Sequence, residues 1–247
     1  MTIWNAILLG LVQGIAEFLP ISSSGHLSIL QNLFHMSTAE NGHLFFDVLL
    51  HLGTLISICI VYWRDIVAMV RETIAFFRSA RLPAEQRRQQ LPAARMVLMI
   101  ILATLPLFLI LPVNDLVEQL YYHTFFIGLM LILTGFLLFV ADKMPKGTPP
   151  EKTMRVRDAL VIGVCQAVAT IPGLSRSGTT IAAGMATGLD RSFAVRFSFL
   201  MSLPAVLGAN ILALAKAAKT GIDVSLLPAY LVGMLVAMAS GIVAIGL

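Results

Sequence analysis

The sequence predicts an all-α polytopic membrane protein, an inverted-topology repeat with two re-entrant helix pairs and about five to six transmembrane helices. Hydrophobic residues make up 58% of the 247 residues and charged residues only 12%, against about 25% charged in soluble domains. The mean hydropathy is +0.88. So few charges cannot cover a soluble surface, which excludes a soluble enzyme, a disordered chain and a disulfide scaffold. We expect a single membrane domain over residues 1–247.

Five apolar runs approach the length of a spanning helix, which is about 20 mostly apolar residues. They are Phe45–Trp63, Met96–Pro112, Thr124–Ala141, Phe193–Ala218 and Leu226–Leu247. Basic residues gather in two stretches between these runs, 64–95 and 142–157, which are predicted to be cytoplasmic loops. The net charge of +4 therefore indicates membrane orientation, and no nucleic-acid partner is expected.

Two further apolar regions are interrupted and do not read as spans. Ile3–Phe18 is followed by Pro20, a Ser-Ser-Ser-Gly-His run and the short Leu27–Met36. Ala159–Ile171 is followed by a Pro-Gly pair, a Ser-Arg-Ser-Gly run and the short Thr180–Leu189. Broken backbone at membrane depth is tolerated only where it is buried in protein or lines a wet cavity. Each region is therefore predicted to be a re-entrant helix pair and a candidate site.

The two interrupted regions also resemble each other in sequence. A shift of 153 positions aligns Gly10 with Gly163, Gln13 with Gln166, Ser22 with Ser175, Ser24 with Ser177 and Gly25 with Gly178. The repeat halves are predicted at about residues 3–63 and 156–218. Three spans separate the two regions, so they enter the membrane from opposite sides. Interrupted segments at matching places in inverted halves point to a site near the midplane.

Ionisable residues inside the membrane are costly and indicate function. Gln13 and Glu17 share one helix face at i, i+4 spacing, and Glu17 beside an anionic substrate could hold a divalent cation. We expect a divalent cation, Mg²⁺ or Ca²⁺, because both prefer oxygen ligands and phosphate supplies the rest. The alternative is that Glu17 orients His26. Asp47 and His51 also stand at i, i+4 and are given a supporting role at most.

Both interruptions open a helix with serine and glycine, an arrangement whose free backbone N–H groups bind phosphate. Arg176 adds a planar guanidinium that suits phosphate oxygens. Two plainer alternatives exist: the serines cap the following helix, or Arg176 pairs with a carboxylate such as Glu17 or Asp47. The residues expected to bind phosphate are Ser22, Ser24, Gly25, Ser175, Ser177, Gly178 and Thr180. The residues expected to be catalytic are Glu17, Ser23, His26 and Arg176.

Two motifs resemble those of the undecaprenyl pyrophosphate phosphatase (bacitracin resistance) family. The segment from Gln13 to His26, QGIAEFLPISSSGH, is similar to the family's Glu/Gln-x-x-x-Glu and Ser-Gly-His motif. PGLSRSGTT at residues 172–180 is similar to its Pro-Gly-x-Ser-Arg-Ser signature. The segments 46–54 and 196–204 resemble family segments as well, so the resemblance covers nearly the whole chain.

The resemblance implies an enzyme that removes the terminal phosphate of undecaprenyl diphosphate for cell-wall synthesis. It implies a multi-pass protein of the bacterial cytoplasmic membrane, whose active site opens to the outer face. Gln13 and Glu17 would be the metal or acid/base pair, Ser23 and His26 the nucleophile region, and Ser175, Arg176, Ser177 and Thr180 the diphosphate clamp. Whether Ser23, His26 or water attacks phosphorus stays open, as does a homodimer.

The alternative from another class is a polyprenyl-phosphate transporter or flippase, because inverted repeats with broken helices are transporter architecture. His26 and the serines beside Glu17 favour chemistry, since a carrier needs only the arginine and the amide groups. A second membrane phosphatase class shares the Ser-Gly-His motif. It requires a histidine six residues after its arginine, where this chain has Ala182.

Overall fold

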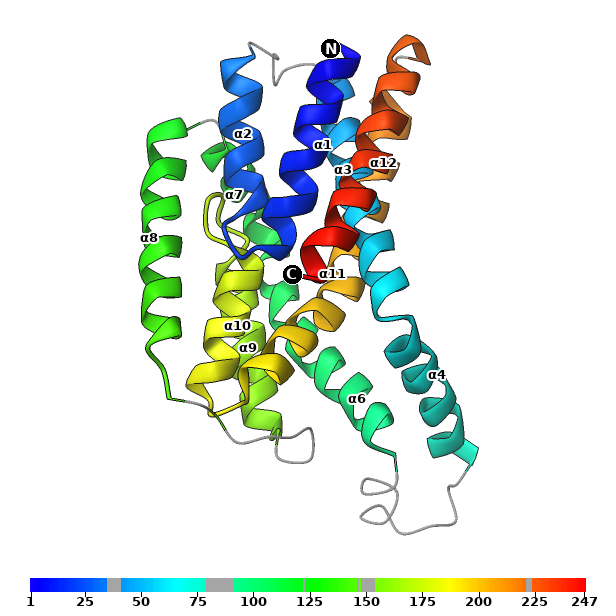
Figure 1. The fold of residues 1–247 in the computed structure, drawn as a ribbon, viewed down its shortest axis with the longest axis vertical. Helices are drawn as coiled ribbons and strands as arrows, with labels where there is room; N and C mark the ends of the chain where they lie inside the picture. Colours follow the sequence, from blue (N-terminus) through cyan, green and yellow to red (C-terminus); the bar gives the residue numbers. More distant parts are fainter. Residues whose placement is uncertain (35–40, 79–90, 122, 146, 148–153, 221–223) are drawn as a thin grey trace.

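The computed structural model describes residues 1–247 except 35–40, 79–90, 122, 146, 148–153 and 221–223 (Figure 1). The described residues form helices and no β-strand, which confirms the all-α prediction. The longer helices are α1 (Ile3–Phe18), α2 (Ser23–Leu33), α3 (Asn41–Val61), α4 (Trp63–Arg78), α6 (Pro92–Thr104), α8 (Thr124–Asp142), α9 (Val156–Val168), α10 (Arg176–Ala186), α11 (Arg191–Thr220) and α12 (Leu227–Ile245). Short helical segments are η1 (Leu105–Leu109), η2 (Leu111–Val113), α7 (Asn114–Leu120) and η3 (Val224–Leu226).

Four described helical stretches are long and apolar enough to cross a membrane: Pro92–Val113, Thr124–Asp142, Arg191–Leu212 and Leu227–Ile245. A fifth is counted if Phe45–Val61 and Trp63–Arg78, bent by 75° at their junction, form one broken span. All five predicted spans therefore correspond to helices, and the chain is a multi-pass membrane protein.

The two predicted re-entrant pairs are present and enter from opposite ends of the molecule (Figure 1). Helix α1 runs from one end to the middle and α2 returns to that end, while α9 and α10 do the same from the other end. The aligned glycines also play the same part in each half. A Cβ on Gly10 would meet the carbonyl of Gly233, and one on Gly163 would meet the carbonyl of Ala103.

The predicted basic loop at 64–95 is wrong in its described parts, because residues 64–78 belong to α4 and residues 92–95 begin α6. Two carboxylates stabilise this helix. Asp65 pairs with Arg196 of α11, and Glu72 accepts the backbone N–H of Ala93 at 2.6 Å at the start of α6. Residues 79–90, and 146 and 148–153 of the second predicted loop, lie outside the described residues.

Close backbone contact joins α1 to α12. A Cβ on Gly14 would lie 2.5 Å from the carbonyl oxygen of Ala237, so the two helices approach to a distance that excludes larger side chains. Beside this contact, the ring of Phe46 stacks on Tyr230 with centroids 5.5 Å apart. This packing fixes α1, and with it Glu17, against the rest of the molecule.

Gly14→Ala is expected to lower the midpoint of thermal unfolding in detergent, because the added methyl group must push α12 away. Overpacking of this kind costs about 1–3 kcal/mol. Gly128→Ala in α8 is the matched control, since a Cβ there meets nothing within 4 Å. That control gains helix propensity and should leave the midpoint unchanged or higher. Equal midpoints for the two variants would contradict the close α1–α12 contact.

Candidate active site

The two interruptions meet in the middle of the molecule. A Cβ on Gly25 would lie 3.1 Å from the Cα of Gly173, and one on Gly178 would lie 3.0 Å from the carbonyl oxygen of Pro20. The Ser177 hydroxyl donates to the backbone carbonyl of Glu17 at 3.1 Å. The first and second breaks therefore build one site, with residues far apart in sequence.

The helices that leave the two breaks start in the same way. Ser22 and Ser175 are the N-cap residues of α2 and α10, and each hydroxyl accepts the backbone N–H of the glycine three residues later, at 3.4 and 3.1 Å. Each also lies within hydrogen-bonding reach of the serine hydroxyl two residues on, at 3.5 and 3.3 Å. Capping thus accounts for Ser22 and Ser175 and leaves Ser23, Ser24 and Ser177 without a capping role.

Ser22 has a φ of +71°, in the left-handed region that serine rarely adopts. A backbone held there costs about 1–3 kcal/mol and persists only when its surroundings impose it. Such outliers cluster at ligand clamps and active sites. The strained turn fixes where Ser23 and Ser24 project.

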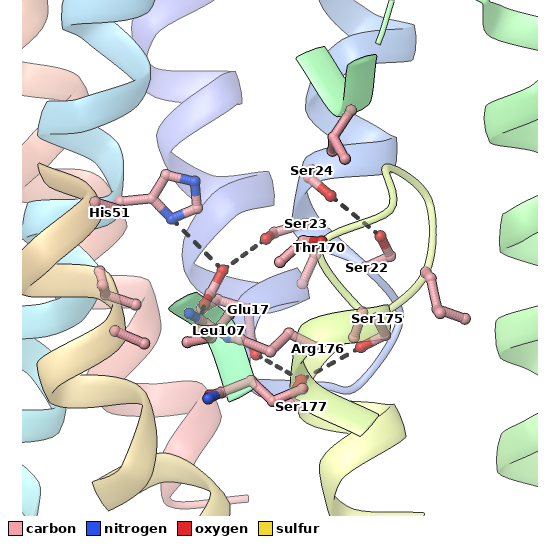
Figure 2. Close-up of a pocket in the computed structure, with 18 of the residues that line it drawn as sticks. Glu17, Ser22, Ser23, Ser24, His51, Leu107, Thr170, Ser175, Arg176 and Ser177 are labelled. Atoms are coloured by element: carbon pink, nitrogen blue, oxygen red, sulfur yellow. Dashed lines mark hydrogen bonds and ion pairs between the residues drawn. The ribbon is translucent and has the colours of Figure 1, made fainter. Parts of the chain in front are cut away.

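Glu17 is the hub of the site (Figure 2). Its Oε1 pairs with Nη2 of Arg176, and its Oε2 accepts the Ser23 hydroxyl at 2.6 Å and the Gln13 amide at 3.1 Å. Arg176 therefore pairs with a carboxylate, as in the second of the two plainer alternatives, and its partner is Glu17. Asp47 instead accepts Nε2 of Gln31 at 2.7 Å. A phosphate clamp at Arg176 must consequently compete with an ion pair already in place.

The histidine beside Glu17 is His51 of α3, so the alternative in which Glu17 orients His26 is not the arrangement found. The Gln13 amide donates one N–H to Glu17. It donates the other to Nδ1 of His51, with 3.0 Å between the two nitrogens. Nδ1 of His51 lies 3.8 Å from Glu17. The packing of α3 against α1 brings Glu17 and His51 together. Their positions in the sequence did not predict this contact.

His26 is bound within its own helix turn. Its Nδ1 lies 2.8 Å from the carbonyl of Ser22, and because a carbonyl only accepts, Nδ1 donates the proton. His26 is not among the described residues that line the cavity at the site. It holds the strained Ser22 turn in place.

A cavity of about 390 Å³ opens beside Glu17 and Arg176, within the size range of small-molecule sites. Seven predicted site residues line it: Glu17, Ser22, Ser23, Ser24, Ser175, Arg176 and Ser177. Five other predicted site residues are not among the described residues that line it: Gln13, Gly25, His26, Gly178 and Thr180. Thr180 shares a 2.6 Å hydrogen bond with Ser198 of α11.

Sequence reasoning missed several polar residues of the cavity, and had given His51 only a supporting role. Gln166, Thr170, Tyr121 and Asn210 also line it. The alignment with Gln13 was a usable signal for Gln166. For Asn210, the sequence offered only the presence of a single amide side chain in an otherwise apolar stretch, which does not by itself predict a site.

The described residues bring no group of three or more His, Cys, Asp and Glu side chains together as a metal site. Glu17 is the carboxylate in the cavity lining, and Arg176 already pairs with it. Gln13 turns its Nε2 toward Glu17, and its Oε1 is buried without a partner. A cation therefore fits only where substrate oxygens supply most of its ligands, with Glu17 as the protein ligand.

A family model and several curated relatives all place this chain in the same family. Residues 6–247 match the family model described as "Bacitracin resistance protein BacA". A protein of Thermodesulfovibrio yellowstonii named undecaprenyl-diphosphatase is 41% identical, over 98% of this chain and 86% of its own length. Proteins with the same name from Alkaliphilus metalliredigens and Methanosphaera stadtmanae are 39% and 37% identical, over 99% and 92% of this chain and 88% and 82% of their own lengths.

Proposed function

The chain belongs to the BacA family of bacitracin resistance proteins, and from this we propose that it hydrolyses undecaprenyl diphosphate to undecaprenyl phosphate and inorganic phosphate. The observation that carries the proposal is the Ser23–Glu17–Arg176 contact inside a cavity at two helix N-termini. The relatives above are named for this activity, and none of those names describes a transporter. The product would return as the lipid carrier of cell-wall synthesis.

Substrate binding comes first in the proposed mechanism. The N-termini of α2 and α10 offer backbone N–H groups and the Ser24 hydroxyl to the diphosphate. The Ser177 hydroxyl joins them by turning from the backbone carbonyl of Glu17 to a phosphate oxygen. Arg176 then exchanges its contact with Glu17 for phosphate oxygens, which it can bind with two parallel N–H groups. This exchange releases Glu17 Oε1 from Arg176 when the substrate is bound, while Oε2 stays on the Ser23 hydroxyl.

Ser23 is the nucleophile in this proposal, because its hydroxyl already donates to Glu17 at 2.6 Å. The proton passes to Glu17 while Oγ bonds to the terminal phosphorus and the bond from that phosphorus to the bridging oxygen breaks. Undecaprenyl phosphate leaves with the electron pair, and Arg176 stabilises charge on the transferring group. Water then bonds to the phosphorus of the phosphoserine while the bond to Oγ breaks. Oγ recovers its proton from Glu17, and phosphate leaves with both protons of the water, which restores the Ser23 hydroxyl and the Glu17 carboxylate. His26 acts as a positioning residue through Ser22.

A divalent cation, Mg²⁺ or Ca²⁺, belongs to the proposal. Glu17 Oε1, which contacts Arg176 here, would hold it together with diphosphate oxygens. Bound there, it would offset charge on the phosphates.

The proposed orientation places the basic ends of α4, α6, α8 and α9 in the cytoplasm, as the positive-inside rule requires. These ends lie on one side of the molecule, and α7 lies toward the other (Figure 1). Val117 and Tyr121, from α7 and the turn after it, line the cavity. An active site open to the outer face of the cytoplasmic membrane follows.

Purified protein in detergent is expected to release one phosphate for each undecaprenyl diphosphate converted to the monophosphate. Phosphate and lipid product are measured together. Lipid that binds and is recovered uncleaved would overturn the phosphatase and favour the transporter.

Chelation of divalent cations is expected to lower phosphate release by about tenfold or more, because positive charge on the phosphates is lost. Added Mg²⁺ or Ca²⁺ should restore it, and chelator saturated with Mg²⁺ is the control. Release that survives chelation would remove the cation from the mechanism and leave the phosphatase intact.

A further inference from the structure

His51 of α3 lines the cavity beside Glu17 and has no part in the mechanism above. Its side chain is 31% exposed. Nδ1 of the ring lies 3.0 Å from Nε2 of Gln13 and 3.8 Å from Oε2 of Glu17. Nε2, on the other edge of the ring, makes no hydrogen bond to the described residues and is not among their buried unpaired polar atoms. This nitrogen is therefore open to the cavity.

The Gln13 amide determines where the His51 ring carries its proton. The Gln13 atom beside Nδ1 is a nitrogen, because the same atom lies 3.1 Å from the Glu17 carboxylate, which an amide oxygen would face as a second acceptor. Its N–H points at Nδ1, so Nδ1 accepts. An imidazolium would instead set two N–H groups against each other. The ring is consequently neutral, with its proton on Nε2.

His51 and Ser23 lie beside the same oxygen of Glu17. The Ser23 hydroxyl donates to Oε2 at 2.6 Å and Nδ1 of His51 lies 3.8 Å from that atom, whereas Arg176 pairs with Oε1. Figure 2 shows His51 and Arg176 on opposite sides of the Glu17 side chain. A phosphoryl group that bonds to Ser23 Oγ therefore has the guanidinium on one side and the imidazole on the other.

We infer that Nε2–H of His51 donates a hydrogen bond to the transferred phosphoryl group, and that Gln13 is the positioning residue that holds His51 in this tautomer. The inference rests on the proposed function and adds a substrate contact to the same cavity. The neutral ring has no ion pair to break, so this donor is in place before substrate arrives, unlike Arg176. Donors fixed in advance toward developing charge are the ones that stabilise a transition state. His51 is not a base here, because Gln13 occupies its unprotonated nitrogen.

Two substitutions separate the donor from the contact with Gln13. His51→Asn can place an amide oxygen near the position of Nδ1 and has no group at the position of Nε2. His51→Gln can place an amide N–H near the position of Nε2. We expect His51→Asn to lower kcat/KM and the affinity for inorganic phosphate about tenfold or more, the usual effect of losing one hydrogen bond to a charged group. His51→Gln should retain most of both. Calorimetry on the full chain in detergent gives the affinity, and phosphate release from undecaprenyl diphosphate gives kcat/KM.

His123→Asn is the matched control, because His123 is exposed at the start of α8 and is not among the described residues that line the cavity. It should change neither quantity. The opposite order, with His51→Asn close to wild type and His51→Gln impaired, would show that His51 only holds Gln13 and would overturn the inference. Equal values for the two substitutions, whether normal or lowered, would overturn it as well, because the donor would then make no difference.

The tautomer is tested without any activity, by nitrogen NMR of protein that carries isotope-labelled histidine. The His51 signals are those lost in His51→Asn. They should show the proton on Nε2 in the wild type, and Gln13→Leu should weaken this preference. A proton on Nδ1, or on both nitrogens, would overturn the inference. Absence of phosphate release by the wild type would fail the proposed function, while calorimetry and NMR would still decide whether His51 is a phosphate donor.

Discussion

Arg176→Lys is expected to lower kcat/KM for phosphate release by about 10²–10³-fold, the range found when one charge-stabilising donor is removed from an active site. Lysine keeps the positive charge, so it can still pair with Glu17 in the resting protein. It cannot present two parallel N–H groups to a phosphate. The substitution therefore tests the binding of phosphate by Arg176 separately from its ion pair with Glu17.

Initial rates of phosphate release over a range of lipid concentrations give the measurement. Arg191→Lys is the matched control, because that arginine is exposed, pairs with Asp142 at 2.9 Å and is not among the described residues that line the cavity. It should retain normal kinetics. Near-normal activity of Arg176→Lys would show that Arg176 serves only to neutralise Glu17, and the proposed exchange of partners would be wrong.

The sequence predicted the two re-entrant helix pairs correctly because the residues that interrupt each helix are easily recognised. Pro20 and the serine run end one helix and cap the next, and the same chemistry recurs 153 positions later. The inverted arrangement followed from the number of spans between the two breaks. Helix α4 was missed because the seven arginines of residues 64–95 resemble a loop, while the apolar face that makes α4 a helix is visible only at helical spacing.

The sequence predicted which residues belong to the site better than it predicted which of them pair with one another. His26 is near Glu17 in sequence, but its ring is bound to Ser22 within α2. His51 reaches Glu17 because α3 packs beside α1, a tertiary contact that spacing does not encode. Likewise, sequence could not decide between phosphate and carboxylate for Arg176. The structure has the carboxylate, Glu17, and in the proposed mechanism Glu17 is therefore a base restrained by an ion pair.

Glu17→Gln is expected to lower kcat by about 10²–10⁴-fold, the usual loss when a positioned general base is removed. Glutamine keeps the size of the side chain and an oxygen that can accept from Ser23. It cannot take the Ser23 proton, and it no longer pairs electrostatically with Arg176. Arg176 is then available to phosphate without first leaving a carboxylate.

The signature of this variant is a fall in kcat together with equal or tighter binding of inorganic phosphate, measured by calorimetry on the same preparation. Asp142→Asn, which removes the exposed carboxylate opposite Arg191, is the control for loss of one negative charge. If Glu17 mainly holds a cation on the substrate, its loss should instead weaken binding and raise KM. A preserved kcat with raised KM would therefore assign Glu17 to substrate binding and exclude it as the base for Ser23. A lowered kcat with undiminished phosphate affinity means that the ion pair with Arg176 restrains Glu17 until substrate arrives.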